Sequence, residues 1–147
     1  MKVKDFMVPV ARVATCNPED TLDKVVALML DKKISSVIVI ATGDATVPVG
    51  IVTKTNLLMA YQDQLSLTNA TIKEIMSTNL KYVHDFDSKD DAAQILEGLG
   101  HHHAIVINKE NHFLGVISTY DIATEDAKDA RAFPWNRTAL APAAHAK

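Results

Sequence analysis

The chain has 147 residues, of which 48% are hydrophobic and 22% are charged, and its formal net charge at pH 7 is -3. This composition can form a hydrophobic core, which excludes an intrinsically disordered polymer, and no basic block points to duplex nucleic acid as the main partner. No apolar run is long enough to cross a bilayer or to act as a signal peptide, and a single cysteine, Cys16, excludes both an intrachain disulfide and a multi-cysteine metal site. We therefore expect a soluble cytoplasmic protein that binds neither nucleic acid nor a membrane.

The first half of the chain opens with a short motif, Val-Lys-Asp-Phe-Met at residues 3–7, and a polar loop follows it. Residues 18–21, Pro-Glu-Asp-Thr, are a helix-start signal. The apolar residues after this signal recur at helical spacing and predict one core-facing side of a helix: Leu22, Val25, Val26, Met29 and Leu30.

Two strands and a second helix are predicted next. Residues 34–40 are rich in β-branched side chains and predict a buried strand, and residues 47–52 predict its partner after a turn at Gly43 and Asp44. The helix expected over residues 54–64 carries three apolar or aromatic side chains on one side: Leu57, Leu58 and Tyr61.

The second half of the chain repeats this plan after a polar connector. Residues 72–76, Ile-Lys-Glu-Ile-Met, match the opening motif, and Ser88 is the expected helix cap. The helix that follows is predicted to bury four side chains: Ala92, Ile95, Leu96 and Leu99. Strands at 104–107 and 113–118, the turn between them at 108–111 and a closing helix over 120–130 complete the repeat.

The most informative segment is a turn from strand to helix that occurs in both halves. Residues 50–56 read Gly-Ile-Val-Thr-Lys-Thr-Asn, and residues 115–121 read Gly-Val-Ile-Ser-Thr-Tyr-Asp. A hydroxyl side chain, Thr53 or Ser118, stands at each expected helix cap. A helix that begins there directs its free amide groups and the positive end of its dipole beyond the strand, which is a favourable place for a phosphate group.

The repeat predicts the fold class. Neither half could bury its sheet face and its helix faces alone, so we expect an α/β protein in which two β-α-β-β-α units pack sheet to sheet around a pseudo-twofold axis. The expected boundaries are residues 1–64 for the first unit, 65–71 for the linker, 72–130 for the second unit and 131–147 for a C-terminal tail. Phe133 and Trp135 favour docking of this tail over disorder.

The duplicated motifs resemble a pair of cystathionine-β-synthase (CBS) domains, the arrangement called a Bateman module. The resemblance covers roughly residues 1–128. It implies a regulatory module, not an enzyme, which binds AMP, ADP, ATP or S-adenosylmethionine in clefts between the repeats and needs no other cofactor. It also implies that Ser118 contacts phosphate while Asp121 holds the ribose, and that Thr53 and Asn56 do so in the other cleft. Asn56 departs from the family pattern, because an amide lacks the charge that strengthens a bond to the ribose hydroxyls.

A purely structural role for the same side chains is the alternative. Thr53 and Ser118 are good helix caps, and Asn56 and Asp121 could bond back to the cap residue. Capping explains the hydroxyls completely. It explains Asp121 less well, because the reciprocal cap prefers the longer Glu or Gln.

Two further groups of residues have candidate roles. His101, His102 and His103 begin the second strand region, where alternation along a strand prevents all three from binding one metal, and we expect His102 or His103 near the phosphate. Ordinary strand-edge histidines are the main alternative, and a metal site is a minor one. Lys54 lies in the first turn of its helix, where a cation is unfavourable unless an anion is present. Cys16 is expected to be a buried, inert thiol.

Two functions therefore remain open from the sequence. The first is an adenosine-ligand sensor that acts in trans on an unidentified target protein, and the second is a dimerisation or protein-interaction module with empty clefts. No catalytic arrangement is visible. Exposed apolar positions on the helices predict a homodimer, formed through Leu57, Leu58, Met59 and Ile122.

Overall fold

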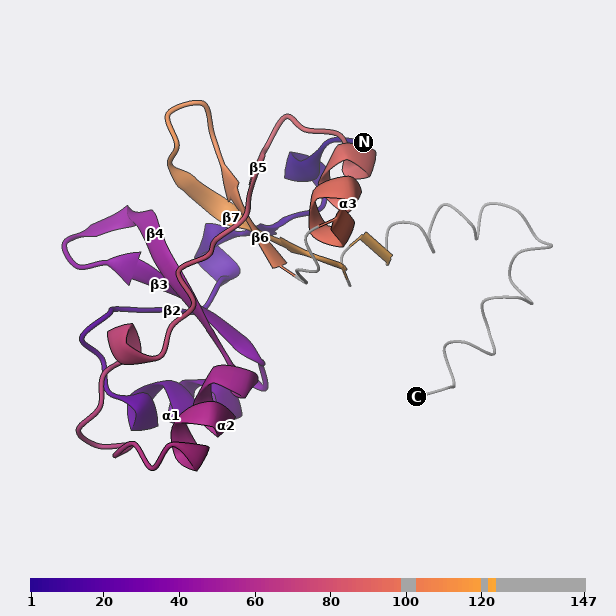
Figure 1. The fold of residues 1–147 in the computed structure, drawn as a ribbon. Helices are drawn as coiled ribbons and strands as arrows, with labels where there is room; N and C mark the ends of the chain where they lie inside the picture. The colour runs from indigo at the N-terminus through magenta and orange to yellow at the C-terminus, as the bar shows by residue number, and fades with distance from the viewer. Residues whose placement is uncertain (99–102, 120–121, 124–147) are drawn as a thin grey trace, which may run out of the picture.

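The computed structural model describes residues 1–98, 103–119 and 122–123 (Figure 1). Within these residues no helix is long and apolar enough to cross a membrane. The described helices, 3-10 turns (η) and strands are, in chain order, η1 (Val3–Asp5), β1 (Val8–Pro9), η2 (Val10–Arg12), β2 (Thr15–Cys16), α1 (Leu22–Lys32), β3 (Ser36–Ala41), β4 (Asp44–Thr53), α2 (Lys54–Gln62), η3 (Ile72–Glu74), β5 (Tyr82–His84), α3 (Lys89–Gly98), β6 (His103–Ile107) and β7 (Phe113–Ser118).

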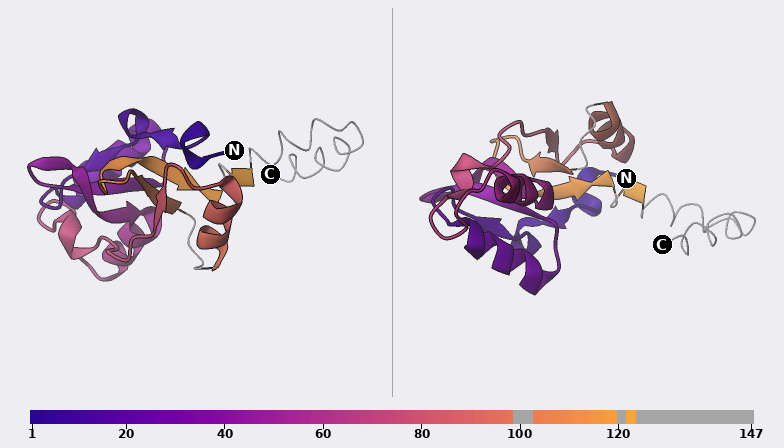
Figure 2. Two further views of the ribbon diagram at one scale, coloured as in Figure 1. Left: turned by 90° about the horizontal axis from the view of Figure 1, so that it is seen from above. Right: turned by 60° about the horizontal axis from the view of Figure 1, so that its bottom comes forward.

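Two sheets with the same local plan form the centre of the fold. In one sheet, in the order β2-β3-β4, β2 is parallel to β3 and β3 is antiparallel to β4. In the other, in the order β1-β7-β6-β5, β5 is parallel to β6 and β6 is antiparallel to β7. Figures 1 and 2 show α3 apart from α1 and α2, on a different part of the molecule. The predicted α/β fold of two repeated units is confirmed.

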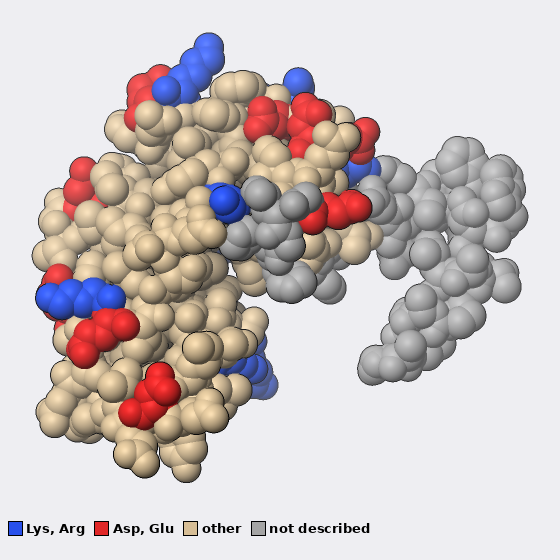
Figure 3. Space-filling view, viewed as in Figure 1, with Lys and Arg blue, Asp and Glu red and all other residues tan. Residues whose placement is uncertain are grey.

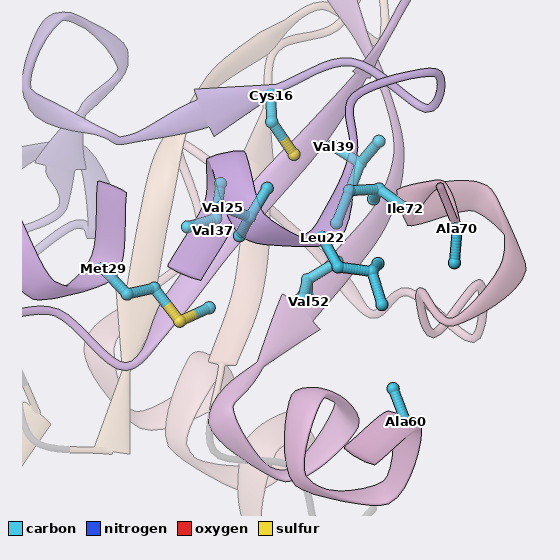
Figure 4. Packing of buried hydrophobic residues seen from close by; sticks show 10 residues of the cluster. All are labelled: Cys16, Leu22, Val25, Met29, Val37, Val39, Val52, Ala60, Ala70 and Ile72. Atoms are coloured by element: carbon cyan, nitrogen blue, oxygen red, sulfur yellow. The ribbon is translucent and has the colours of Figure 1, made fainter. Parts of the chain in front are cut away.

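The two sheets meet through an apolar layer. Ile38 of one sheet and Ile105, Ile107 and Phe113 of the other are buried in one cluster, with Ile51 and Val116 packed against it. Each sheet also has its own core on the side of its helices, and Figure 4 shows the core of the first half. The central strands β3 and β6 are therefore buried on both faces, which explains their continuous runs of apolar, largely β-branched residues.

The opening segment of the chain packs on the second half. Val3 donates its backbone N–H to the carbonyl oxygen of Asp87 at 2.9 Å, and Lys4 donates to that of Asp85 at 3.0 Å. The strand β1 then pairs with β7, with Val8 opposite Val116. The side chain of Val3 is fully buried in the second core.

The corresponding segment of the second repeat packs on the first half in return. The amides of Ile72 and Lys73 donate to the carbonyl oxygens of Asp20 and Pro18, each at 2.9 Å. Ser77 exchanges two backbone hydrogen bonds with Ile51 of β4. Ile72 is fully buried in the first core, where Figure 4 shows it among residues of α1, β3 and β4. Each half therefore contains the leading segment of the other.

Two side chains predicted to share the apolar side of the first helix are less buried than expected. Leu22, Val25 and Met29 face the core, but Val26 is only half-buried and Leu30 is 73% exposed. The expectation that Leu30 is a core residue is wrong, because the sheet covers only one stripe of α1 and this side chain lies beyond it. The first strand of each expected β-α-β-β-α unit is β2 in one half and β5 in the other, although the sequence placed neither of them. The strand β1 and the 3-10 turns were not predicted.

Some sequence predictions fall outside the described residues. These are the side chain of Leu99, most of the helix over residues 120–130, and the tail with Phe133 and Trp135. Ile122 is described, and its side chain is 8% exposed in the second core. The expectation that Ile122 joins an exposed dimer surface is wrong, because this side chain already packs inside its own half.

Candidate functional site: two clefts between the halves

The first predicted strand-to-helix turn forms as expected. β4 ends at Thr53 and α2 begins at Lys54, with Thr53 in an extended conformation at the helix cap. The Thr53 hydroxyl accepts a hydrogen bond from the amide of Asn56 at 3.3 Å. In return, Asn56 Oδ1 accepts from the backbone N–H of Thr53 at 2.8 Å and from its hydroxyl at 3.0 Å. The predicted reciprocal cap is confirmed for this pair.

This cap limits what Asn56 can offer to a ligand. A carbonyl oxygen has two lone pairs, and both of those on Asn56 Oδ1 already accept hydrogen bonds from Thr53. The amide group Nδ2 remains as a donor. Asn56 can therefore donate to a ribose hydroxyl without disturbing the cap, but it can accept from one only by breaking it.

A cavity of about 430 Å3 opens beside this turn, and we call it the Thr53 cleft. Thr53, Lys54, Thr55 and Asn56 of the first half form one side of it, and the second half supplies the other. The remaining lining residues are Ser35, Ile51, Ser77, Asn79, Leu80, Lys81, His103, Ala104 and Ile105. All three described site residues predicted in the first repeat, Thr53, Lys54 and Asn56, are brought together here.

A second cavity of about 480 Å3, the Ser118 cleft, lies beside the matching turn. Ser118 and Val116 of the second half face residues of the first half across it. The other lining residues are Val8, Arg12, Val13, Ala14, Lys33, Ile34, Ser35, Ser36, Ile38, Lys54 and His103. Asp121 and His102 lie outside the described residues.

His103 is the described member of the histidine triplet. It is the first residue of β6, is half-buried, and lies opposite Ser118 in the register of β6 and β7. Ser36 occupies the matching place in the first half, opposite Thr53. His103 lines both clefts. Among the described residues, no group of three or more His, Cys, Asp or Glu side chains could hold a metal ion.

The described linings of both clefts are cationic and hydroxyl-rich. Lys54 and Lys81 line the Thr53 cleft, and Arg12, Lys33 and Lys54 line the Ser118 cleft. No aspartate or glutamate is among the described lining residues of either one. Figure 3 shows that acidic and basic side chains both occur over the described part of one face of the molecule.

Sequence reasoning missed Arg12, Lys33, Ser35 and Lys81. A signal for two of them is present in the repeat, because Arg12 and Lys81 each lie five residues after the methionine that ends the short motif. Ser35 lies in the first-repeat counterpart of the histidine triplet, whereas no periodicity or motif marks Lys33.

Cys16 takes no part in either cleft. The side chain is buried in the first core, and burial raises the pKa of the thiol from 9.0 to about 12, with the nearby Asp20 carboxylate adding to the shift. The thiol therefore stays protonated at neutral pH, as expected for an inert cysteine.

Comparison with known families assigns the repeat. A sequence model of the CBS domain matches residues 3–63 and again residues 72–128. This chain belongs to the CBS domain family. The sequence matches no curated protein.

Solved CBS structures share the fold. CBSX2 in complex with AMP is 21% identical, with a TM-score of 0.75 over 86% of this chain and 96% of that one; another structure of CBSX2 is from Arabidopsis thaliana. PAE2072 from Pyrobaculum aerophilum, complexed with AMP, is also 21% identical, with a TM-score of 0.74 over 87% of this chain and 99% of that one. The CBS domain of a bacterial CNNM/CorC family Mg2+ transporter, in complex with ATP, is 22% identical, with a TM-score of 0.77 over 85% of this chain and 86% of that one.

Proposed function

We propose that this CBS domain pair is a regulatory sensor of adenine nucleotides such as AMP, ADP or ATP, which acts on a separate target protein. The observation that carries the proposal is the lining of the two clefts. Basic and hydroxyl side chains line both clefts beside the start of α2, and no described carboxylate is among the lining residues. Such a lining favours an anionic ligand. The cavity volumes of about 430 and 480 Å3 are in the range of small-molecule sites.

In the Ser118 cleft, Ser118 would receive the phosphate, with Arg12 or Lys33 adding charge. Asp121, which lies outside the described residues, is the acceptor that we propose for the ribose hydroxyls. Apolar side chains, including Val13 and Ile38, would cover the adenine. In the Thr53 cleft, Thr53 and Lys81 would take the phosphate and Asn56 would donate to the ribose.

The charge of the clefts also ranks the adenosine ligands. S-adenosylmethionine has a sulfonium and an ammonium group against one carboxylate, so it brings net positive charge to a cationic cleft. We expect AMP, ADP and ATP to bind more tightly than S-adenosylmethionine. No redox or catalytic step is required of the protein.

Calorimetric titration with AMP, ADP, ATP, adenosine and S-adenosylmethionine tests this proposal. The phosphate-bearing ligands should bind, and raising the salt concentration should weaken them more than it weakens adenosine. Tighter binding of S-adenosylmethionine than of AMP would refute the charge argument. No binding of any of the five ligands would leave the interaction module as the function.

An exposed apolar groove favours dimerisation as a second function, compatible with the first. It has a volume of about 600 Å3 and lies between α1 and α2. Leu30, Leu58 and Tyr61 line it and are 73%, 68% and 77% exposed. We propose that this groove is covered by a second copy of the chain, since apolar side chains gathered on one face mark an interface more often than they mark free surface.

Light scattering of a groove variant tests the homodimer. Leu58→Lys should convert a dimer to a monomer at tens of micromolar protein. Val47→Lys is the matched control, because Val47 is also exposed but lies on β4, outside the residues that line the groove. A monomeric parent protein would refute the proposed dimer without affecting nucleotide binding to the clefts.

A further inference from the structure

The two clefts are not separate cavities with separate walls. Three residues line both: Ser35, Lys54 and His103. Ser35 immediately precedes β3, Lys54 is the first residue of α2, and His103 is the first residue of β6. The backbone N–H of Lys54 donates to the carbonyl oxygen of Ser35 at 3.1 Å, which joins two of these residues directly. The clefts therefore meet along a shared wall drawn from both halves.

Of the three shared residues, Lys54 is the one with an ammonium group. Of the two clefts, Arg12 and Lys33 line only the Ser118 cleft, and Lys81 lines only the Thr53 cleft. Lys33 and Lys54 also line the apolar groove between α1 and α2. Within the described part of the chain, the ion pair between Lys24 and Asp20 is the one present, so no described carboxylate neutralises Lys54.

The position of Lys54 in its helix is also unfavourable without an anion. It occupies the first turn of α2, where the helix dipole repels a cation. A phosphate in either cleft would relieve this repulsion and pair with the ammonium group. Because Lys54 lines both clefts, a first phosphate that pairs with its ammonium group reduces what a second phosphate would gain from it.

We propose that Lys54 couples the two clefts, so that a nucleotide in one weakens the binding of a nucleotide in the other. The inference rests on the proposed nucleotide-binding function, and it adds that the affinity of one cleft depends on whether the other is occupied. The coupling requires a phosphate on the ligand, so adenosine binds the two clefts independently. Negative coupling of this kind spreads the response of the module over a wider range of nucleotide concentration than two independent sites would.

Each cleft has a side chain that can report its own occupancy. Ile51 lines the Thr53 cleft alone, and Val116 lines the Ser118 cleft alone. Methyl-labelled protein titrated with AMP and followed by NMR would give one binding curve from each methyl group. Two independent sites give two simple hyperbolas whether or not their affinities are equal, whereas coupled sites give curves broader than hyperbolas when their two affinities differ by less than the coupling factor. The adenosine titration, which is free of the coupling, measures how far apart the two affinities lie.

The expected result for the unsubstituted protein is a broadened curve at both methyl groups with AMP and simple hyperbolas with adenosine. The second AMP should bind about fivefold or more weakly than it does to an empty protein, at the lower end of common coupling strengths. In Lys54→Gln, both affinities should fall and both curves should become hyperbolic. Lys81→Gln and Arg12→Gln are matched controls, each of which should lower affinity in one cleft and leave the parent's coupling in place.

Different failures have different meanings. Simple hyperbolas with AMP in the unsubstituted protein would overturn the coupling while leaving nucleotide binding intact. Broadened curves that persist in Lys54→Gln would overturn the role of Lys54. No change in either methyl signal with any nucleotide would overturn the proposed function itself, and the coupling with it.

Discussion

The backbone N–H of Ile72 donates a hydrogen bond to the carbonyl oxygen of Asp20 at 2.9 Å, which fixes the leading segment of the second repeat against the helix start of the first. Val3 makes the reciprocal contact with Asp87. Both side chains are fully buried in the core of the half that they join. Neither half can complete its core without the other, so we expect the protein to unfold in one cooperative transition.

Truncation of Ile72 tests this exchange. Ile72→Ala should lower the free energy of unfolding by about 2–5 kcal/mol, the range for deleting a buried branched side chain, whereas Ile72→Val should cost about 0.5–1.5 kcal/mol. Urea unfolding followed by circular dichroism and by a probe in each half would measure both values. Separate transitions for the two halves of the unsubstituted protein would contradict the exchange as a source of cooperativity.

The two repeated glycines should differ in how they tolerate a side chain. A Cβ at Gly115 would overlap the backbone oxygen of Val8, whereas a Cβ at Gly50 would lie 2.6 Å from the sulfur of Met76, a flexible side chain that can move. Gly115→Ala should therefore destabilise the protein by about 1–3 kcal/mol more than Gly50→Ala does. Thermal unfolding of the two variants would measure the difference, and equal losses would show that β1 can shift away from β7.

Cys16 should be unreactive until the protein unfolds. A thiol reagent at pH 8 should modify the folded protein about a hundredfold or more slowly than the urea-unfolded chain, because the buried thiol is protonated and inaccessible. Rapid modification under native conditions would contradict the packing of the first core.

The same thiol predicts a loss of stability in alkali. Well below pH 9.0 the thiol is protonated in both states, but as the pH rises through 9.0 toward about 12 the unfolded chain releases its proton while the folded one keeps it. The contribution of this group to the free energy of unfolding is therefore present below pH 9.0 and is lost as the pH rises through that interval. Comparison with Cys16→Ala in urea titrations at several pH values would isolate it.

The two ribose-facing residues should not be equivalent. On the proposed function, Asp121→Ala removes a charged acceptor and should cost about 1.5–3 kcal/mol in nucleotide binding, or roughly tenfold to hundredfold in affinity. Asn56→Ala should cost less in binding, because both lone pairs of its oxygen already bond to Thr53, but it should destabilise α2 by about 1 kcal/mol through the lost cap. Site-resolved titration and thermal unfolding would separate the two effects, and equal losses of affinity would show that the charge of Asp121 gives it no advantage over Asn56.

Sequence periodicity predicted the parts of the fold that depend on local pattern. The β-branched runs became β3, β4, β6 and β7, and Ser88 caps α3 by accepting from the amide of Asp91 at 3.1 Å. The Thr53 cap followed from residue types alone. The repeated motif, by contrast, gave no indication that residues 3–7 pack on the second half. A sequence repeat shows that two segments are alike, but not which half of the protein each segment contacts.

The candidate site was predictable only on the side formed by the repeated turns. Thr53, Lys54 and Asn56 are neighbours in sequence, so a motif reveals them together. Arg12 reaches the Ser118 cleft from the 3-10 turn η2, and Lys33, which also lines it, is the left-handed residue that ends α1. Their contribution depends on how the sheets pack, which involves contacts distant in sequence that no local pattern encodes.

The exchange of leading segments also determines how the chain could be divided. A break in the connector between α2 and Ala70 would give a first fragment that lacks Ile72 and a second that lacks Val3, so each would expose an unfilled core alone. Mixed together, the two pieces could restore both cores without a peptide bond between them. By the same reasoning, a single repeat would expose apolar core residues and would associate with a second polypeptide. We therefore expect a gene that encodes one repeat to yield an oligomer and not a stable monomer.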